Sequence, residues 1–149
     1  MRIIIVRHGD PTHYTIDSLT EKGKREVEFL SERLIKLDVK EFYVSPLRRA
    51  KETAAATLEK INRTAIECEW LREFSPKIKH PDSPKEAPFA WDWLPQDWTQ
   101  DERYYRYDEW ANTEIMKSGG VDKEVKWVTD NLDKVIAEHG IMVISPTYM

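Results

Sequence analysis

A short apolar run that ends in two basic side chains is the feature that most constrains the fold of this chain. The residues from Ile3 to Val6 are all β-branched, the pattern of a strand buried on both faces of a sheet. Arg7, His8 and Gly9 follow at once. Ligands of open α/β sheets bind beyond the carboxyl ends of the strands, where such side chains are useful. His8 is therefore a candidate nucleophile or base and Arg7 a candidate anion clamp; the alternative is a structural histidine and a surface arginine.

The first half of the chain alternates predicted strands and helices, as parallel βαβ units do. Thr20 is the expected N-cap of a helix whose apolar residues recur at helical spacing, namely Val27, Leu30, Leu34 and Leu37. Residues 42–44 form the next predicted strand, and residues 65–69 form another that places Cys68 in the core. Between them, Ser45 is predicted to cap a helix with Pro46 at its first position. Its apolar face comprises Leu47, Ala50, Ala54, Leu58 and Ile61.

Packing does not explain the two arginines in the first turn of that second helix. A helix N-terminus favours anions, so Arg49 is unfavourable there unless an anion or an acid lies opposite. Arg48 is predicted to pair with Glu52 at the i,i+4 spacing. Arg49 is therefore a candidate anion-binding residue.

Motifs in a fixed order extend this pattern. They read Arg-His-Gly at 7–9, Leu-Thr-x-x-Gly at 19–23, Ser-x-Leu-x-Arg-Ala-x-x-Thr-Ala at 45–54 and Leu-x-Glu at 71–73. Together they resemble the histidine phosphatase superfamily, in its phosphoglycerate-mutase-like branch, strongly over residues 1–74 and more loosely over 75–138. The resemblance implies an α/β fold: a three-layer sandwich with a mostly parallel sheet flanked by helices. Residues 1–149 are expected to form one such domain, shortened at its C-terminus.

The resemblance also implies a metal-independent phosphomonoester hydrolase that acts through a phosphohistidine and needs no cofactor. In that chemistry His8 attacks phosphorus, while Arg7 and Arg49 stabilise the charge on the equatorial oxygens. Glu73 protonates the leaving alkoxide and later deprotonates the attacking water.

Two further residues are assigned to substrate binding from the same resemblance. Tyr14 stands where the family often has an asparagine that reaches the phosphate, and Thr12 or His13 is a nearby substitute. The other histidines, His13, His80 and His139, are left out of the catalytic set because they lie in predicted loops or at a helix end.

The last apolar run departs from the family pattern. Residues 141–145 resemble the strand that delivers the family's second histidine, but Pro146 stands at the expected position. The chain is expected to be truncated, altered after about Gly140, or a shortened relative. Loss of one such donor commonly costs about 2.7–4 kcal/mol of transition-state stabilisation. The alternative within catalysis is a phosphoglycerate-mutase-like phosphotransferase. The absent histidine favours a second alternative, a non-catalytic phosphate-binding or oligomeric module, and the incomplete sheet predicts self-association.

Residues 75–110 form a Pro- and Trp-rich insertion. Its prolines exclude a long helix, and its tryptophans either line the site or anchor the insertion to the core. A charged surface helix is predicted over 101–117 and a break at 118–120. An amphipathic helix follows, ended by His139-Gly140, with one apolar face made of Val121, Val125, Val128, Leu132 and Val135.

Composition limits the partners. The net charge of −4 and the pI of about 5.6 argue against nucleic acid and membranes as partners and leave a small phosphorylated substrate. Cys68 is the single cysteine, so no internal disulfide forms. The N-terminal apolar run is too short for a signal peptide or a membrane span, which predicts a cytoplasmic protein.

Overall fold

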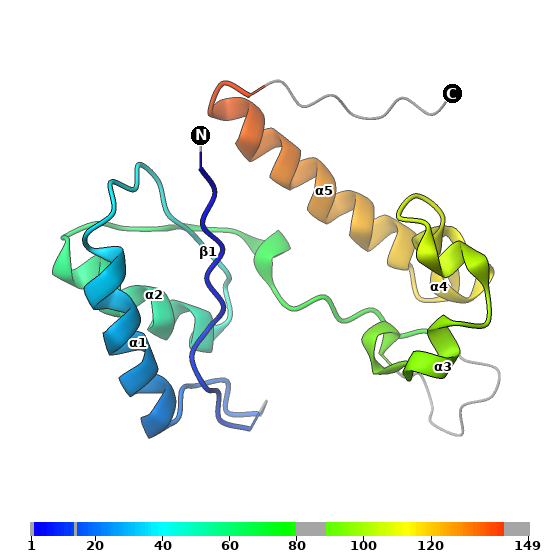
Figure 1. Cartoon of the computed structure of the whole chain (residues 1–149), viewed down its shortest axis with the longest axis horizontal. Coiled ribbons are helices and arrows are strands. Elements are labelled where there is room, and N and C mark those ends of the chain that lie inside the picture. The colour runs from blue at the N-terminus through cyan, green and yellow to red at the C-terminus, as the bar shows by residue number, and fades with distance from the viewer. Residues whose placement is uncertain (1, 14, 80–88, 142–149) are drawn as a thin grey trace. The chain divides into compact units, whose positions relative to one another are not determined.

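The structure is a computed structural model that describes residues 2–13, 15–79 and 89–141. The chain divides into two compact units, Met1–Arg72 and Glu73–Met149, and each is described by itself (Figure 1). It has the predicted α/β character, with helices and a small parallel sheet. The expectation of one domain over residues 1–149 stays a prediction.

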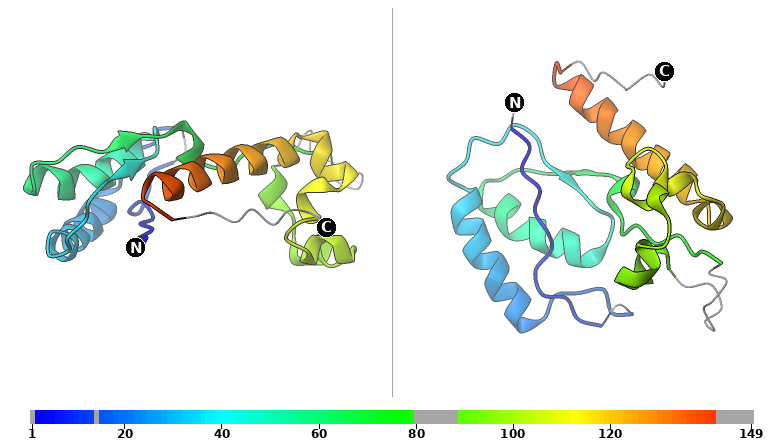
Figure 2. Two further views of the ribbon diagram at one scale, coloured as in Figure 1. Left: turned by 90° about the horizontal axis from the view of Figure 1, so that it is seen from above. Right: turned by 45° about the vertical axis from the view of Figure 1, so that its right-hand side comes forward.

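The first unit contains the predicted βαβ arrangement. Its elements are α1 (Glu21–Leu34), β1 (Tyr43–Val44), α2 (Arg48–Lys60), β2 (Ile66–Glu67) and the 3₁₀ turn η1 (Glu69–Leu71). β1 and β2 pair in parallel, with Tyr43 opposite Ile66, and α2 forms the crossover between them. α1 and α2 lie side by side in both views of Figure 2. Cys68 follows β2 and is buried, as predicted, and this burial raises the pKa of its thiol.

Helix α1 begins as the sequence predicts. The Thr20 side chain accepts the backbone N–H of Gly23 at 3.0 Å, which satisfies one of the free amides of the first turn. Val27 is buried on the inner face. At the C-terminal end of α2, the Lys60 ammonium donates a hydrogen bond to the Ser31 hydroxyl of α1 at 2.7 Å. It also forms an ion pair with Glu28 of α1 at 2.6 Å. The two helices are thus joined by apolar packing and by this charged contact.

Helix α2 differs from its prediction in its start and in its buried face. It begins at Arg48 with Leu47 as the N-cap, while the Ser45 hydroxyl only accepts the Leu47 N–H at 3.3 Å. Its buried residues are Arg49, Thr53 and Thr57, one helical turn apart, rather than the predicted apolar set. Arg49 and Thr53 are buried because they make hydrogen bonds that hold the N-terminal loops, as described below.

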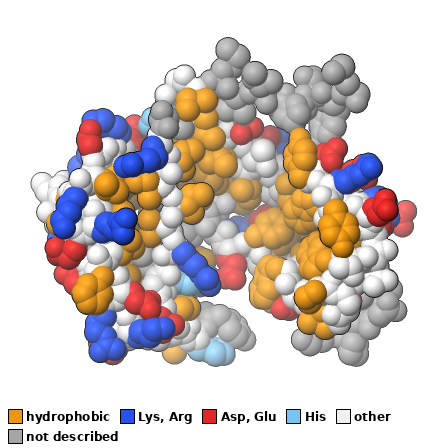
Figure 3. All heavy atoms as spheres, viewed as in Figure 1, with side chains coloured by type: hydrophobic (Ala, Val, Ile, Leu, Met, Phe, Trp, Pro, Cys, Tyr) orange, Lys and Arg blue, Asp and Glu red, His pale blue; other side chains and the backbone are white. Residues whose placement is uncertain are grey.

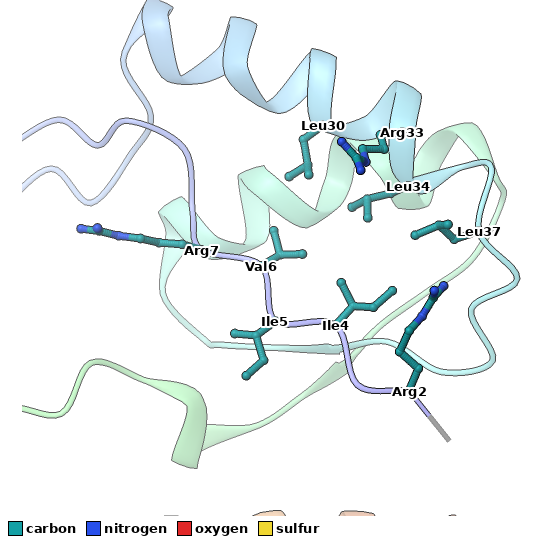
Figure 4. Close-up of a pocket in the computed structure, with 9 residues that line it drawn as sticks. All are labelled: Arg2, Ile4, Ile5, Val6, Arg7, Leu30, Arg33, Leu34 and Leu37. Atoms are coloured by element: carbon teal, nitrogen blue, oxygen red, sulfur yellow. The ribbon is translucent and has the colours of Figure 1, made fainter.

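The prediction of a buried strand at Ile3–Val6 is wrong. These residues form no strand, and all four side chains are exposed, Ile5 by 92%. Figure 4 shows Ile4 and Val6 directed toward α1 and Ile5 directed away from it. A pocket of about 520 Å³ lies between this segment and α1, with Leu30, Leu34 and Leu37 on the helix side. Apolar side chains are therefore open at the surface of the first unit (Figure 3).

The second unit is built from short helical segments and one long helix. They are η2 (Ala90–Asp92), α3 (Pro95–Trp98), η3 (Glu102–Tyr105), η4 (Trp110–Asn112), α4 (Glu114–Ser118) and α5 (Val121–Glu138). The single helix predicted over 101–117 is wrong, because local caps divide the segment. Asp101 accepts the Arg103 N–H at 2.9 Å and starts η3, and Thr113 accepts the Met116 N–H at 3.4 Å and starts α4. The predicted break and the following helix are confirmed, and Gly140 follows the helix end with a left-handed φ of 79°.

The core of the second unit is aromatic. Trp93 is 8% exposed and packs edge-on against Tyr104, with ring centroids 5.2 Å apart. It shares this core with Ile78, Met116 and Val121. Trp93 and Trp98 thus anchor the insertion to its own core, one of the two roles that the sequence left open. Among the described residues, no helix has the length and apolar character needed to cross a membrane.

Candidate active site

His8 is held in one orientation by the backbone of the residue that follows it. Its Nδ1 lies 2.8 Å from the carbonyl oxygen of Gly9, and the side chain is half-buried. A carbonyl oxygen only accepts hydrogen bonds, so Nδ1 carries the proton and donates. The neutral ring then has its lone pair on Nε2, which is the protonation state that a nucleophilic histidine needs.

The loop that carries His8 is clamped between α1 and α2. On the α2 side, the Gly9 N–H donates to Thr53 Oγ1 at 3.1 Å, and the Thr53 hydroxyl donates to the Arg49 carbonyl at 2.8 Å. On the α1 side, a Cβ at Gly9 would lie 2.8 Å from the Gly23 carbonyl oxygen, and a Cβ at Gly23 would collide with the Asp10 backbone. The two motif glycines therefore allow the backbones to approach closely, which fixes the position of His8.

Arg49 is a buried guanidinium paired with an acid. The residue is 9% exposed, and its Nη1 lies 2.6 Å from Asp17 Oδ1. The other carboxylate oxygen, Oδ2, accepts the backbone N–H of Arg48 at 2.7 Å. Asp17 is thus the acid opposite Arg49, one of the two kinds of partner, an anion or an acid, that its first-turn position requires. Burial acts to raise the pKa of Asp17, but the hydrogen bonds from the Arg48 amide and the Arg49 guanidinium outweigh it and lower the pKa below its ordinary value.

A second carboxylate holds the same loop to α2. Glu52 accepts the Leu19 N–H at 2.8 Å and the Ser18 hydroxyl at 2.9 Å, and it pairs with Arg48 at 2.7 Å as predicted. Burial acts to raise the pKa of Glu52, but these three hydrogen bonds together lower it. Asp17 and Glu52 thus fix residues 17–19 against the first two turns of α2.

A pocket of about 240 Å³ opens beside His8. It is lined by Arg7, His8, Gly9, Asp10, Pro11 and Glu26. Arg7 is exposed, and Lys22 lies 3.6 Å from Asp10 and 3.4 Å from Glu26, which offsets their charge. The Thr20 hydroxyl donates to Asp10 at 2.7 Å and lowers the pKa of that carboxyl. The pocket is therefore small, with one cation next to the histidine and two carboxylates on its wall, and Arg49 is not among its lining residues.

Three other residues that the sequence assigns to the site are Thr12, Tyr14 and Glu73. Thr12 donates its hydroxyl to the Ser18 carbonyl at 3.0 Å and accepts the Ser18 N–H at 3.2 Å, so it closes the loop over residues 12–18. Tyr14 lies outside the described residues. Glu73 is an exposed residue of the second unit, which is described separately from the unit that contains His8. The roles assigned to these three residues stay predictions.

Sequence reasoning did not assign roles to Asp17 or Thr53. Thr53 lies within the 45–54 motif, where helical spacing from Arg49 (i, i+4) was the available signal. Asp17 had a weaker signal, because the first-turn position of Arg49 required an anion or an acid without indicating which residue could supply it. The contact crosses 32 residues of sequence, and only the fold selects the partner.

Comparison with known families agrees with this geometry. The model of the histidine phosphatase superfamily (branch 1) matches residues 3–144. The chain belongs to the histidine phosphatase superfamily.

Individual relatives match the chain in part. The mitochondrial serine/threonine-protein phosphatase Pgam5 of Drosophila sechellia is 36% identical over 87 residues, covering 50% of this chain and 29% of the relative. The Pgam5 protein of Drosophila melanogaster matches to the same extent. The 2,3-bisphosphoglycerate-dependent phosphoglycerate mutase of Thermoplasma acidophilum is 35% identical over 79 residues, covering 47% of this chain and 40% of the relative. The chain thus spans less than half the length of the relatives that it matches.

Proposed function

We propose that the chain is a metal-independent phosphomonoester hydrolase that acts through a phosphohistidine at His8. The observation that carries the proposal is the hydrogen bond from His8 Nδ1 to the Gly9 carbonyl, which leaves Nε2 as the nucleophilic nitrogen. The small pocket beside His8 supports a phosphate group as the ligand through Arg7, the cation on its wall.

The reaction has two steps. His8 Nε2 attacks phosphorus in line, a nitrogen–phosphorus bond forms, and the ester oxygen leaves with a proton from Glu73. Water then attacks the phosphohistidine, Glu73 accepts the proton from the water, and the nitrogen–phosphorus bond breaks to release phosphate. Arg7 and Arg49 stabilise the negative charge on the equatorial oxygens in both steps.

A phosphotransferase is the closest alternative. Relatives named as a protein phosphatase and as a phosphoglycerate mutase both match the chain, and both names describe phosphoryl transfer. The two functions share the phosphohistidine and differ in whether water or a second substrate takes the phosphoryl group. Detection of the phosphohistidine therefore tests both the hydrolase and the phosphotransferase. The molecule that accepts the phosphoryl group, water or a second substrate, distinguishes the two functions.

The test is hydrolysis of p-nitrophenyl phosphate in EDTA by the full chain and by its His8→Ala variant. A rapid quench with ³²P-labelled substrate, followed by treatment with acid and with alkali, detects an acid-labile, alkali-stable phosphohistidine. We expect turnover and label in the unmodified chain and neither in His8→Ala. His139→Ala is the matched control, because His139 follows α5 in the second unit and is expected to leave both signals unchanged. Equal turnover in His8→Ala and the unmodified chain would refute the proposal.

The non-catalytic alternative makes a different prediction. Pro146 stands where the family's second histidine is expected, and this favours a module that binds phosphate without turnover. That module would bind inorganic phosphate in titration calorimetry, and it would give no labelled histidine.

A further inference from the structure

Asp17 contacts Arg49 and can fix the position of its side chain, although Asp17 lies outside the sequence motifs. Its two carboxylate oxygens divide between the Arg49 guanidinium, at 2.6 Å, and the Arg48 backbone N–H, at 2.7 Å. One carboxylate therefore fixes both the side chain of Arg49 and the first amide of α2. A long, flexible arginine loses less conformational entropy on binding an anion when it is already held in place.

The backbone at Asp17 supports a specific role. Its φ is 48°, in the left-handed region that non-glycine residues adopt uncommonly. The preceding turn is closed by hydrogen bonds from Ile16 and Asp17 amides to the His13 carbonyl. Residues kept in such conformations cluster at functional sites, where the surrounding structure compensates for the strain. Here the unusual conformation occurs at the residue whose carboxylate contacts Arg49.

The burial of both side chains makes the Arg49–Asp17 ion pair important for the position of Arg49. Only 11% of the Arg49 side chain and 25% of the Asp17 side chain is exposed. A buried guanidinium without a counter-charge is costly, and its position would change if the counter-charge were removed. Glu52 provides a second attachment for the loop, because it accepts hydrogen bonds from Ser18 and Leu19 and pairs with the side chain of Arg48. This attachment does not involve the Arg49 guanidinium.

We propose that Asp17 is a positioning residue, which holds the Arg49 guanidinium in the orientation that binds the phosphate group of the substrate. The inference rests on the proposed function for the contact between Arg49 and phosphate, because Arg49 is not among the residues that line the pocket beside His8. Asp17 does not touch the substrate, and it acts through Arg49.

The experiment measures the equilibrium dissociation constant of inorganic phosphate by titration calorimetry on the full chain, together with the thermal unfolding midpoint. Asp17→Asn removes the charge, and asparagine tolerates the same left-handed backbone conformation. We expect it to weaken phosphate binding by roughly tenfold, a size typical of coupled neighbouring groups. Glu52→Gln is the matched control, since it loosens the same loop without touching Arg49, and its dissociation constant should stay within about twofold.

A double-mutant cycle separates positioning from general stability. If Asp17 acts through Arg49, Asp17→Asn has no further effect on phosphate binding in an Arg49→Gln background. A persistent tenfold effect in that background would overturn the inference. So would equal weakening by Glu52→Gln, or a failure of the unmodified chain to bind phosphate. Binding that depends on Asp17 without any turnover would refute the proposed function and leave the role of Asp17 standing.

Discussion

At the scale of single residues, polar side chains rather than apolar ones decide how the site is held. Thr53 joins the His8 loop to α2 because its hydroxyl accepts the Gly9 N–H and donates to the Arg49 carbonyl. Thr57, one turn further along the same buried face, has a buried hydroxyl with no hydrogen-bond partner among the described residues. Two threonines on one helix face thus have opposite energetic consequences.

This difference is testable with a matched pair of isosteric substitutions. Thr53→Val leaves the Gly9 N–H without its acceptor, and we expect the free energy of unfolding to fall by about 1–3 kcal/mol. Thr57→Val replaces a hydroxyl that gains nothing from burial, so it is expected to be neutral or stabilising. Urea unfolding followed by circular dichroism measures both. An equal loss in the two variants would show that the Gly9 contact contributes little.

The sequence predicted part of this residue-scale picture. The position of Arg49 in the first turn indicated that an anion or an acid lies opposite, because an unpaired cation opposes the helix dipole. It could not identify Asp17, because the two residues meet only when the loop folds back onto α2. His8 and Arg7 were identified by their place after an apolar run, even though that run forms no strand.

At the scale of elements, the loop residues Asp17, Ser18 and Leu19 are held against α2 by hydrogen bonds. Asp17 of this loop accepts hydrogen bonds from α2, and Glu52 of α2 accepts hydrogen bonds from the loop. Gly23 lets the Asp10 backbone lie directly on α1. The loop is therefore positioned by both helices. Ionised carboxylates provide much of its attachment to α2.

This attachment predicts an acid-sensitive fold. The folded pKa values of Asp17 and Glu52 are lowered, so the stability that these groups contribute is fully present above their unfolded pKa values. It is lost as the pH falls through the lowered folded values, that is, below roughly pH 4. Urea unfolding from pH 7 to pH 3 should show this loss. The double variant Asp17→Asn with Glu52→Gln should be less stable at pH 7 and show a flatter pH dependence.

An exposed carboxylate provides the control for that measurement. Asp38 pairs with Lys40 at the surface, and the hydrogen bond with Lys40 lowers its pKa, but both side chains are largely exposed. Exposed pairs contribute little because water screens them. Asp38→Asn should therefore follow the pH profile of the unmodified chain. A matching change in slope would assign the acid sensitivity to general charge effects instead of the loop.

At the scale of the whole molecule, the chain leaves apolar surface uncovered. The segment Ile3–Val6 is β-branched and exposed, with Ile5 directed away from α1 (Figure 4). Such a surface is typical of interaction sites and of segments that self-associate. The net charge of −4 is too small to prevent association on its own.

We therefore expect the chain to self-associate through this segment. Ile5→Lys would remove about 1.5–3 kcal/mol of apolar burial at the interface, which weakens association by about tenfold or more. Sedimentation velocity over a concentration series measures the effect. Phe29→Lys is the matched control, because Phe29 is an exposed apolar residue of α1 outside the segment. Equal weakening by both substitutions would locate the interface elsewhere.

The sequence by itself determined the features that depend on neighbouring residues. Thr20 begins α1, Gly140 follows α5, and β1 and β2 flank a helix, because caps, glycines and apolar spacing act within a few residues. The motifs likewise determined the family, which the family model confirms.

The tertiary structure decided which distant residues meet. The Arg49–Asp17 ion pair, the Thr53–Gly9 hydrogen bond and the exposure of Ile5 each depend on how loops lie against helices. Local patterns predicted an apolar buried face for α2 and a buried strand at 3–6, and both were wrong. Burial and pairing are properties of the packed chain, so a pattern that favours a strand or an apolar face cannot supply the partner that would cover it.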